Sequence, residues 1–227
     1  MSSVRNITSS TPVPYDLAEK IGVSGVNEIL HVLWQSYHNL KSDNSVVITV
    51  DSEEDDITQE WFVKIQQIWD SRNRATSLTL NGLTPIHQYA DSFMKRGKGK
   101  KSPTIDFCFK DWSTTNSYFG AEAKNLYDKN DKTRPKKIEH YVTTGVDNYI
   151  SGRYGSQSTT SSVIGYVLSG KVSNIVDELK VEIQKGSPVS NLSRAMSIAE
   201  PQYSTRHIRI CDNKEITLYH LFFSFVA

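Results

Sequence analysis

The sequence predicts an α/β protein in which a mixed central β-sheet carries helices on both faces. Stretches with helical periodicity interrupt short apolar runs that are bounded by turn residues, and this alternation disfavours a sandwich of two sheets. A chain of 227 residues is long enough to bury one sizeable core. We therefore expect a single domain over residues 1–227, with an N-terminal tail and helices in 1–45, a core in 57–186 and a terminal β-ribbon in 204–227.

The first half of the chain is predicted to begin with a frayed polar tail at residues 1–13. Helical spacing of apolar residues predicts a helix over 15–40, broken near Gly22 to Gly25, and a second helix over 55–72. The second helix has the stronger amphipathic pattern, and Asp55 or Asp56 can cap it. Its apolar side would contain Ile57, Trp61, Ile65, Ile68 and Trp69. Short strands are expected at 45–50 and at 75–82, the latter ending at the Asn81-Gly82 turn signal.

The second half alternates strands and helices in the same way. Two strands that a hairpin loop can join are followed by a helix, a buried strand, a helix that Gly186 closes, and a two-stranded ribbon. The expected ranges are 104–109, 118–124, 137–151, 161–170, 172–186 and 206–226. We expect the ribbon to turn at residues 212–214 and a glycine-containing loop to occupy 152–160.

Composition excludes several classes of protein. The formal net charge is +1, so attraction to a nucleic acid has to come from local patches, and basic runs at 95–101 and 129–137 bracket the two strands of the expected hairpin. Cys108 and Cys211 have no metal-ligand spacing and suggest no disulfide framework, so we expect both to be small core residues. No apolar run has the length of a signal-peptide core or a membrane span, and we expect a cytoplasmic protein without a membrane partner.

Charged residues inside the two hairpin strands raise the main functional question. Burial of a charge costs several kcal/mol unless a partner or a metal compensates. Because side chains alternate along a strand, Glu122 and Lys124 share a side with Gly120, and Asp106 opposes a face that would hold Ile105, Phe107 and Phe109. If the strands pair as a hairpin, Asp106 lies near Glu122, and two carboxylates and one amine converge.

Two neighbouring carboxylates repel each other unless a proton or a cation bridges them. Mg²⁺ binds one or two protein carboxylates and leaves sites for water and phosphate oxygens, and it lowers the pKa of a bound water. Lys124 could orient or deprotonate that water, its own pKa pushed down by a dication and by desolvation. The alternative is an ordinary cross-strand surface pair. Glu178 and Lys180 have the same spacing on a predicted helix, where residues two apart point to different sides.

Pro103-Thr104-Ile105-Asp106 followed by Glu122-Ala123-Lys124 resembles the signature of the PD-(D/E)XK nucleases, the restriction-endonuclease-like superfamily. The resemblance extends over the order of elements in 57–170. It implies a Mg²⁺-dependent (or Mn²⁺-dependent) endonuclease that hydrolyses phosphodiester bonds in DNA, with a role in restriction or phage defence. Asp106 and Glu122 would be the metal ligands and Lys124 the water-activating or transition-state-stabilising amine. Here two residues separate the proline from the aspartate, so only the acidic part of the first half-motif matches cleanly.

The same resemblance implies further site residues. Members commonly carry an acidic residue on the helix before the first core strand, and Glu60 fits that order best, with Glu28 as the second choice; a solvated helix carboxylate is the alternative for each. Arg153 and Tyr154 would contact a phosphate or stack on a base, unless their loop is a helix-to-strand turn. Lys136 and Lys137 would contact phosphates, or else are solvated loop charges.

Other candidates stay open at this point. His207 and His220 lie on the final ribbon, but a zinc site would need two more ligands, so we expect both to be structural. Trp112, between the motif strands, is a candidate for lid packing or for stacking on a base. The expected assembly is a homodimer or a complex with a partner subunit of a defence system. The alternative function is a catalytically silent nucleic-acid-binding or assembly module with a nuclease-like fold, and an unrelated α/β protein with a fortuitous motif is a third reading.

Overall fold

The computed structural model describes residues 15–75, 83–90, 104–111, 118–128, 137–196 and 198–226, without the side chains of 15–24, 73–75 and 111. Over these residues the chain is mixed α/β, as predicted, with a seven-stranded sheet in the order β1-β2-β3-β4-β7-β6-β5. The strands are β1 (Leu83–Ala90), β2 (Thr104–Asp111), β3 (Tyr118–Leu126), β4 (Thr160–Val167), β5 (Ser190–Ala195), β6 (Gln202–Ile208) and β7 (Glu215–Ser224).

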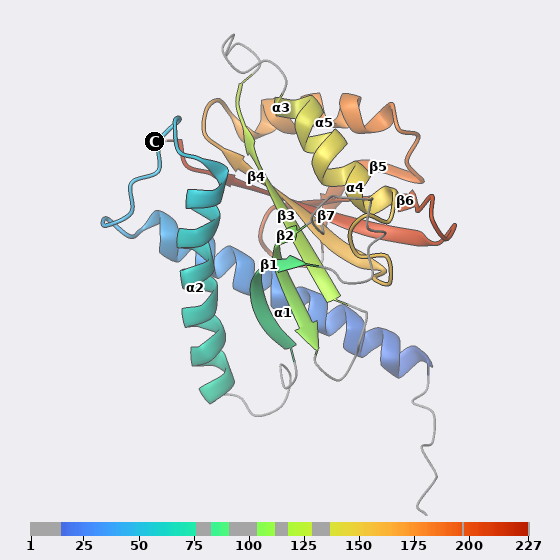
Figure 1. Ribbon diagram of the computed structural model, residues 1–227, viewed down its shortest axis with the longest axis horizontal. Helices are drawn as coiled ribbons and strands as arrows, with labels where there is room; N and C mark the ends of the chain where they lie inside the picture. Colours follow the sequence, from blue (N-terminus) through green and yellow to red (C-terminus); the bar gives the residue numbers. More distant parts are fainter. Residues whose placement is uncertain are drawn as a thin grey trace, which may run out of the picture.

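The helices are α1 (Tyr15–Lys41), α2 (Glu54–Ala75), α3 (Lys137–His140), the π-helical segment η1 (Tyr141–Val146), α4 (Asp147–Ile150) and α5 (Val172–Gln184). None of the helices in the described ranges is long and apolar enough to span a bilayer. Strands β1, β2 and β3 form an antiparallel meander, and the continuous helical stretch α3–η1–α4 then leads to β4, which pairs parallel with β3. Strand β7 pairs parallel with β4 and antiparallel with β6 (Figure 1).

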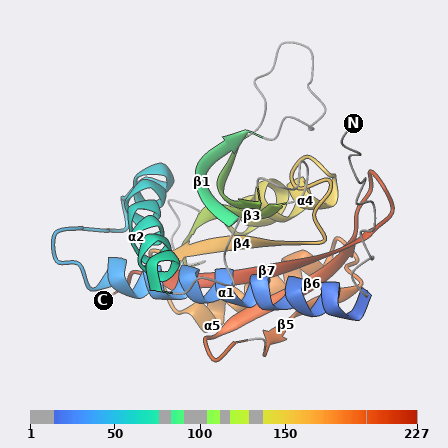
Figure 2. The same cartoon turned by 90° about the horizontal axis from the view of Figure 1, so that it is seen from below.

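Helices cover both faces of the sheet, and each face has its own core (Figure 1). The first core lies under α1 and α2, and α1 extends along the sheet beneath β4 and β7 (Figure 2). It contains Trp34 together with Trp61 and Trp69, and the predicted burial of the last two on the apolar side of their helix is confirmed. The second core lies under η1, α4 and α5. Apolar stripes at helical spacing therefore supply most of the packing that fixes the sheet.

The predictions for the motif strands, the helix that follows them, β4, α5 and the terminal ribbon are confirmed within a few residues. Two details differ. The helix over 137–150 has a π-helical centre, and α5 ends at Gln184 with Ser187, not Gly186, in the left-handed conformation (φ 52°). Of the two cysteines, Cys108 is buried as expected, whereas Cys211 is exposed on the turn between β6 and β7.

Two predictions for the first half of the chain are wrong, because packing in the folded chain outweighs the local sequence signals on which they rest. The predicted break at Gly22 to Gly25 is wrong, because α1 is continuous there; burial of its later apolar stripe outweighs the roughly 1 kcal/mol that each helical glycine costs. The strand at 45–50 is also wrong: the stretch is irregular and Val47 is 79% exposed. The predicted strand at 75–82 lies outside the described residues except for Ala75, which ends α2.

Two strands were not predicted. Strand β1 contains Pro85, His87 and Gln88, which do not read as a strand, but it is the edge of the sheet, where proline is tolerated. Strand β5 forms the other edge, is rich in polar residues, and shifts its pairing register between Ser190 and Ser193. Edge strands lack the apolar pattern of central strands because only one side is paired, so sequence periodicity detects them poorly.

The two ribbon histidines lie in the sheet on either side of one hydroxyl. Thr205 Oγ1 is 2.8 Å from His207 Nε2 and 2.9 Å from His220 Nε2, and His220 Nδ1 lies 2.9 Å from the hydroxyl of Tyr141. Burial lowers the pKa of His207 to about 4 and that of His220 to about 3. Both rings are therefore neutral in the folded chain at neutral pH, and they join β6 and β7 to η1.

We expect these histidines to make stability depend on pH. In the unfolded chain a histidine takes up a proton near its ordinary pKa of 6.5, whereas the folded chain resists it, so their contribution is complete above that pH and is lost as the pH falls. Relative to His220→Gln, the wild type should lose about 1.4 kcal/mol of unfolding free energy per pH unit between about pH 6 and pH 4. Urea unfolding of both proteins measures this difference, and parallel curves would contradict it.

Candidate functional site

The candidate site lies where strand β2 leaves strand β3. Their antiparallel pairing ends at Phe107 and Ala121, so the next N–H groups of β3 on this side have no strand partner. Side-chain carboxylates take their place: the Ala123 N–H donates to Asp106 Oδ2 at 2.7 Å, and the Asn125 N–H donates to Glu54 Oε2 at 3.0 Å. The motif residues thus meet in a gap of the sheet that acidic side chains close.

The regular alternation of strand β2 also fails at this point. Phe107 belongs to the core under α1 and α2, whereas Ile105 belongs to the opposite core, so the predicted common face of Ile105, Phe107 and Phe109 is wrong. In strand β1, Gln88 lies opposite Asp106 and has a φ of 50°. Both strands change faces across this irregularity, which turns the Asp106 carboxylate toward β3 instead of one face of the sheet.

Lys124 is at the centre of the cluster. Its Nζ donates to Glu122 Oε1 at 2.9 Å, to Glu54 Oε1 at 2.9 Å and to the Ala123 carbonyl oxygen at 2.5 Å. Lys124 and Glu122 are only 7% and 6% exposed, whereas Glu54 and Asp106 are half-buried. The cluster is therefore closed at Glu122 and Lys124 and open toward solvent at Glu54 and Asp106.

The proximity of these charges shows in their pKa values. Burial, and then the Asp106 carboxylate, raise the pKa of Glu122 to about 8, although Lys124 opposes the shift. Burial raises the pKa of Asp106 to about 6, again against Lys124. For Lys124, burial lowers the pKa, but the carboxylates of Glu122, Glu54 and Asp106 together raise it above its usual value. From the sequence we expect a lowered pKa for Lys124 beside a bound dication. The protein groups by themselves raise this pKa.

Glu122 has an unsatisfied atom that bears on cation binding. Its Oε2 is buried and has no hydrogen-bond partner among the described residues, although an unpaired buried carboxylate oxygen is costly. Within the described ranges, no group of three or more His, Cys, Asp or Glu residues is arranged to hold a metal ion. Mg²⁺ needs fewer, since it binds through one or two carboxylates and keeps several waters. Glu122 Oε2 and the half-buried Asp106 carboxylate fit that requirement.

The acidic residue that joins the cluster from helix α2 is Glu54, which the sequence reasoning did not select. Glu54 is the first residue of α2, and the segment before it is held on β3 because Asn125 Nδ2 donates to the Ser52 carbonyl at 3.1 Å. Glu60 is exposed farther along α2, and Glu28 pairs with Arg72 at 2.8 Å, so the structure brings neither to the site. The acidic run at residues 51–56 is the signal present in the sequence, but by local pattern it identifies only Asp55 and Asp56, as candidate caps of the helix.

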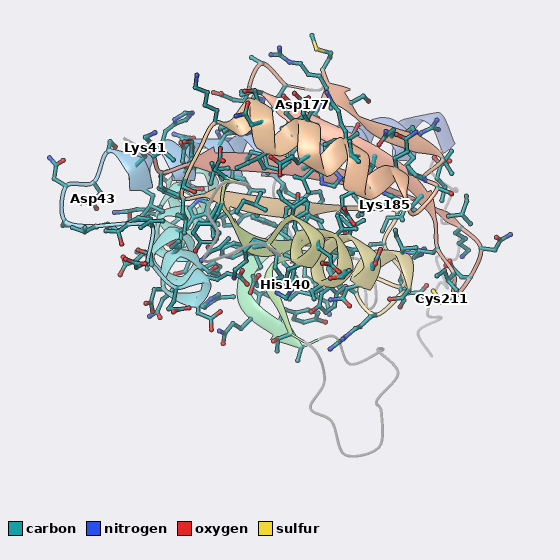
Figure 3. All side chains as sticks on the ribbon, turned by 90° about the horizontal axis from the view of Figure 1, so that it is seen from above. Lys41, Asp43, His140, Asp177, Lys185 and Cys211 are labelled. Carbon is teal, nitrogen blue, oxygen red and sulfur yellow. The ribbon has the colours of Figure 1, made fainter. Side chains whose placement is uncertain are left out.

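The π-helical segment approaches the cluster from the second face of the sheet. A Cβ at Gly145 would lie 2.9 Å from Val163 Cγ1 and 3.9 Å from Lys124 Cγ, so only glycine lets η1 pack this closely on β3 and β4. Just before η1, His140 is exposed on α3 (Figure 3). Its pKa is lowered by burial and then by Lys124. His140 is thus a residue beside the site that sequence reasoning missed, because a single helical histidine gives no signal.

The expected nucleic-acid contacts separate into three groups. Lys136 lies outside the described residues, as do Trp112 and the basic runs apart from Lys137. Arg153 is exposed and accessible to a phosphate, whereas Lys137, the first residue of α3, is half-buried with its Nζ 6.0 Å from the centroid of the Tyr127 ring. Tyr154 is 5% exposed and packs edge-on against Tyr149, with ring centroids 5.6 Å apart. The expected stacking of Tyr154 on a base is therefore not possible in this conformation, because the side chain is buried.

A groove between α3 and α5 lies away from the cluster. These helices pack side by side, with His140 on the first, Asp177 on the second and Lys185 just after the end of the second (Figure 3). None of Glu54, Asp106, Glu122 and Lys124 lines this groove. Its lining is mostly acidic and apolar and consists of Ile138, Glu139, Asn174, Asp177, Glu178, Val181 and Glu182. Four carboxylates make this groove unfavourable for a phosphate backbone.

We expect Glu54→Gln to destabilise the fold by about 1–3 kcal/mol, because it weakens charge-assisted hydrogen bonds to Lys124 and to the Asn125 N–H. The matched control is Glu60→Gln, an exposed residue of the same helix, which should change stability by less than about 0.5 kcal/mol. Urea unfolding at pH 7 compares the two variants. Equal effects would mean that the Glu54 contacts contribute nothing to the fold.

Comparisons with known proteins do not assign the chain to a family. No family model matches it, and neither a curated protein nor a solved structure is similar to it. A function has to be argued from the chemistry of the cluster that Asp106, Glu122, Lys124 and Glu54 form.

Proposed function

We propose that this protein is a Mg²⁺-dependent nuclease that hydrolyses phosphodiester bonds in DNA. The observation that carries the proposal is the convergence of Asp106 and Glu122 with Lys124 at the gap between β2 and β3, together with the unpartnered Glu122 Oε2. Hydrogen bonds within the cluster account for Glu54, for Lys124 and for one oxygen of Glu122. The second buried oxygen of Glu122, Oε2, has no hydrogen-bond partner among the described residues, and a hard cation is a suitable partner for it.

The order of elements supports the same proposal. Helix α2, strands β1 to β3, the helical stretch from α3 to α4 and strand β4 follow one another in the order that the PD-(D/E)XK resemblance implies. Parallel pairing of β4 with β3 makes β3 an internal strand, so its polar residues are supported on both sides. The proposal also includes a restriction-endonuclease-like core for the fold. It further includes a role in restriction or phage defence, as a homodimer or with a partner subunit.

In the proposed mechanism, Asp106 and Glu122 hold the cation and the half-buried Asp106 side admits the phosphate. Bound Mg²⁺ would supply a water of lowered pKa and neutralise charge on the phosphate oxygens. Lys124 donates to three oxygen acceptors, as an ammonium group does, so it does not remove a proton. Its role is to stabilise negative charge on the phosphate, and one of its three hydrogen bonds would be exchanged for one to the phosphate or to the attacking water. The attacking water gives up one proton to solvent as its oxygen bonds to phosphorus, one P–O ester bond breaks, and the leaving oxygen takes up a proton from solvent.

Within this mechanism Glu54 is a positioning residue. It binds Lys124 through Oε1 and the β3 backbone through Oε2, so the ammonium is held by Glu54 as well as by Glu122. Fixing a long lysine side chain before substrate arrives removes the entropy that the transition state would otherwise have to overcome.

Plasmid nicking in Mg²⁺ tests the proposal. We expect Asp106→Ala and Lys124→Ala to lower the nicking rate by at least about 100-fold, because each removes a group that stabilises the transition state. Glu60→Gln should retain the wild-type rate, since that side chain is exposed away from the cluster. Equal nicking by wild type, Asp106→Ala and Lys124→Ala would refute the proposal.

A second measurement separates the nuclease from a silent binding module. If the chain binds DNA with an affinity that neither Mg²⁺ nor Glu122→Gln alters, while no Mg²⁺-dependent nicking is found for the wild type, the binding module is the better description. For the nuclease we expect Glu122→Gln to abolish the effect of Mg²⁺ on DNA affinity, because a neutral amide is a poorer ligand for a hard cation.

A further inference from the structure

Tyr149 has a buried hydroxyl that the proposed mechanism does not use. The residue lies on α4, is fully buried, and its hydroxyl has no hydrogen-bond partner among the described residues. The other fully buried tyrosines differ: Tyr141 bonds to the Val163 carbonyl and to His220, and Tyr166 lies 3.1 Å from Thr58 Oγ1. An unsatisfied buried hydroxyl costs free energy, so a phenylalanine would serve better here if packing were the only requirement.

Gly120 places this hydroxyl beside the cluster. A Cβ at Gly120 would lie 3.0 Å from the Tyr149 hydroxyl oxygen, so that oxygen lies directly over the β3 backbone at this residue. Residues two apart on a strand share a face, and Glu122 is therefore the next side chain along β3 on the side where Tyr149 lies. The Glu122 charge also contributes, after burial, to raising the pKa of Tyr149.

Two unsatisfied polar atoms thus lie on neighbouring positions of one strand face. Glu122 Oε2 accepts a hydrogen bond when the carboxyl is ionised and can donate one when it is protonated, and the Tyr149 hydroxyl can do either. A single water molecule hydrogen-bonded to both atoms would satisfy them, as buried waters typically do for buried polar groups. We propose that Tyr149 is a positioning residue, whose hydroxyl is linked by one water molecule to Glu122 Oε2 and holds that carboxylate in place.

The link has two consequences. It stabilises the folded chain through a coupling between Tyr149 and Glu122 that exists without any metal. It also orients a proposed cation ligand, and this second consequence rests on the proposed function. Partners that orient metal ligands typically change metal affinity by about 10–100-fold when they are removed.

A double-mutant cycle tests the link itself. Urea unfolding is measured in the presence of a chelator for wild type, Tyr149→Phe, Glu122→Met and the double variant, where methionine keeps the length of the side chain but removes the acceptor. We expect the effect of Tyr149→Phe on the unfolding equilibrium constant to differ by at least about threefold between the two backgrounds. The control is Tyr141→Phe, buried on the adjoining η1 segment with its own partners, whose effect should be the same in both.

Mn²⁺ titration by calorimetry tests the second consequence. We expect Tyr149→Phe to weaken Mn²⁺ binding by about 10-fold and Tyr141→Phe to leave it within about twofold. The two proposals fail separately. Absence of Mn²⁺ binding by the wild type overturns the cation site, while the cycle still decides the link. Identical effects of Tyr149→Phe in both backgrounds overturn the link, whatever the Mn²⁺ result.

Discussion

The gap between strands β2 and β3 is the constraint on which the rest of the site depends. Where β2 and β3 separate, backbone N–H groups of β3 lose their strand partners. The carboxylates of Asp106 and Glu54 accept hydrogen bonds from two of these groups. Those carboxylates bring negative charge to buried Glu122, and the Lys124 ammonium compensates it. Each residue of the cluster is thus required by another, and the irregular backbone at Gln88 and Asp106 is what sets them in contact.

A structural role and a catalytic role are not equally good explanations of this cluster. Closing the gap explains why Glu54, Asp106 and Lys124 are charged, since each is hydrogen-bonded to backbone or to an opposite charge. It does not explain the second oxygen of Glu122, which is buried without a hydrogen-bond partner although Oε1 already accepts from Lys124. Retention of an expensive group at the centre of a polar cluster is typical of a functional site.

The helices also show how the cluster is assembled from distant parts of the chain. Helix α2 is held by its apolar stripe against α1 and the sheet, and this packing brings its first residue, Glu54, to Asn125. On the other face, η1 approaches closely enough for Gly145 to lie beside the Lys124 side chain. A π-helical segment shifts the register of the residues after it, which is one way to place Tyr149 over Gly120.

The sequence by itself determined the elements with strong periodicity and the chemistry of the hairpin: strands with Asp106 on one and Glu122 and Lys124 on the other follow from alternation and turn length. It did not reveal the edge strands, which carry a weak pattern, or the change of faces at Asp106. Only the tertiary structure decided that Glu54 rather than Glu60 reaches Lys124, and that Tyr154 is buried. The physical reason is that these contacts join segments far apart in the chain, and packing of whole helices on the sheet, which no local pattern encodes, sets their positions.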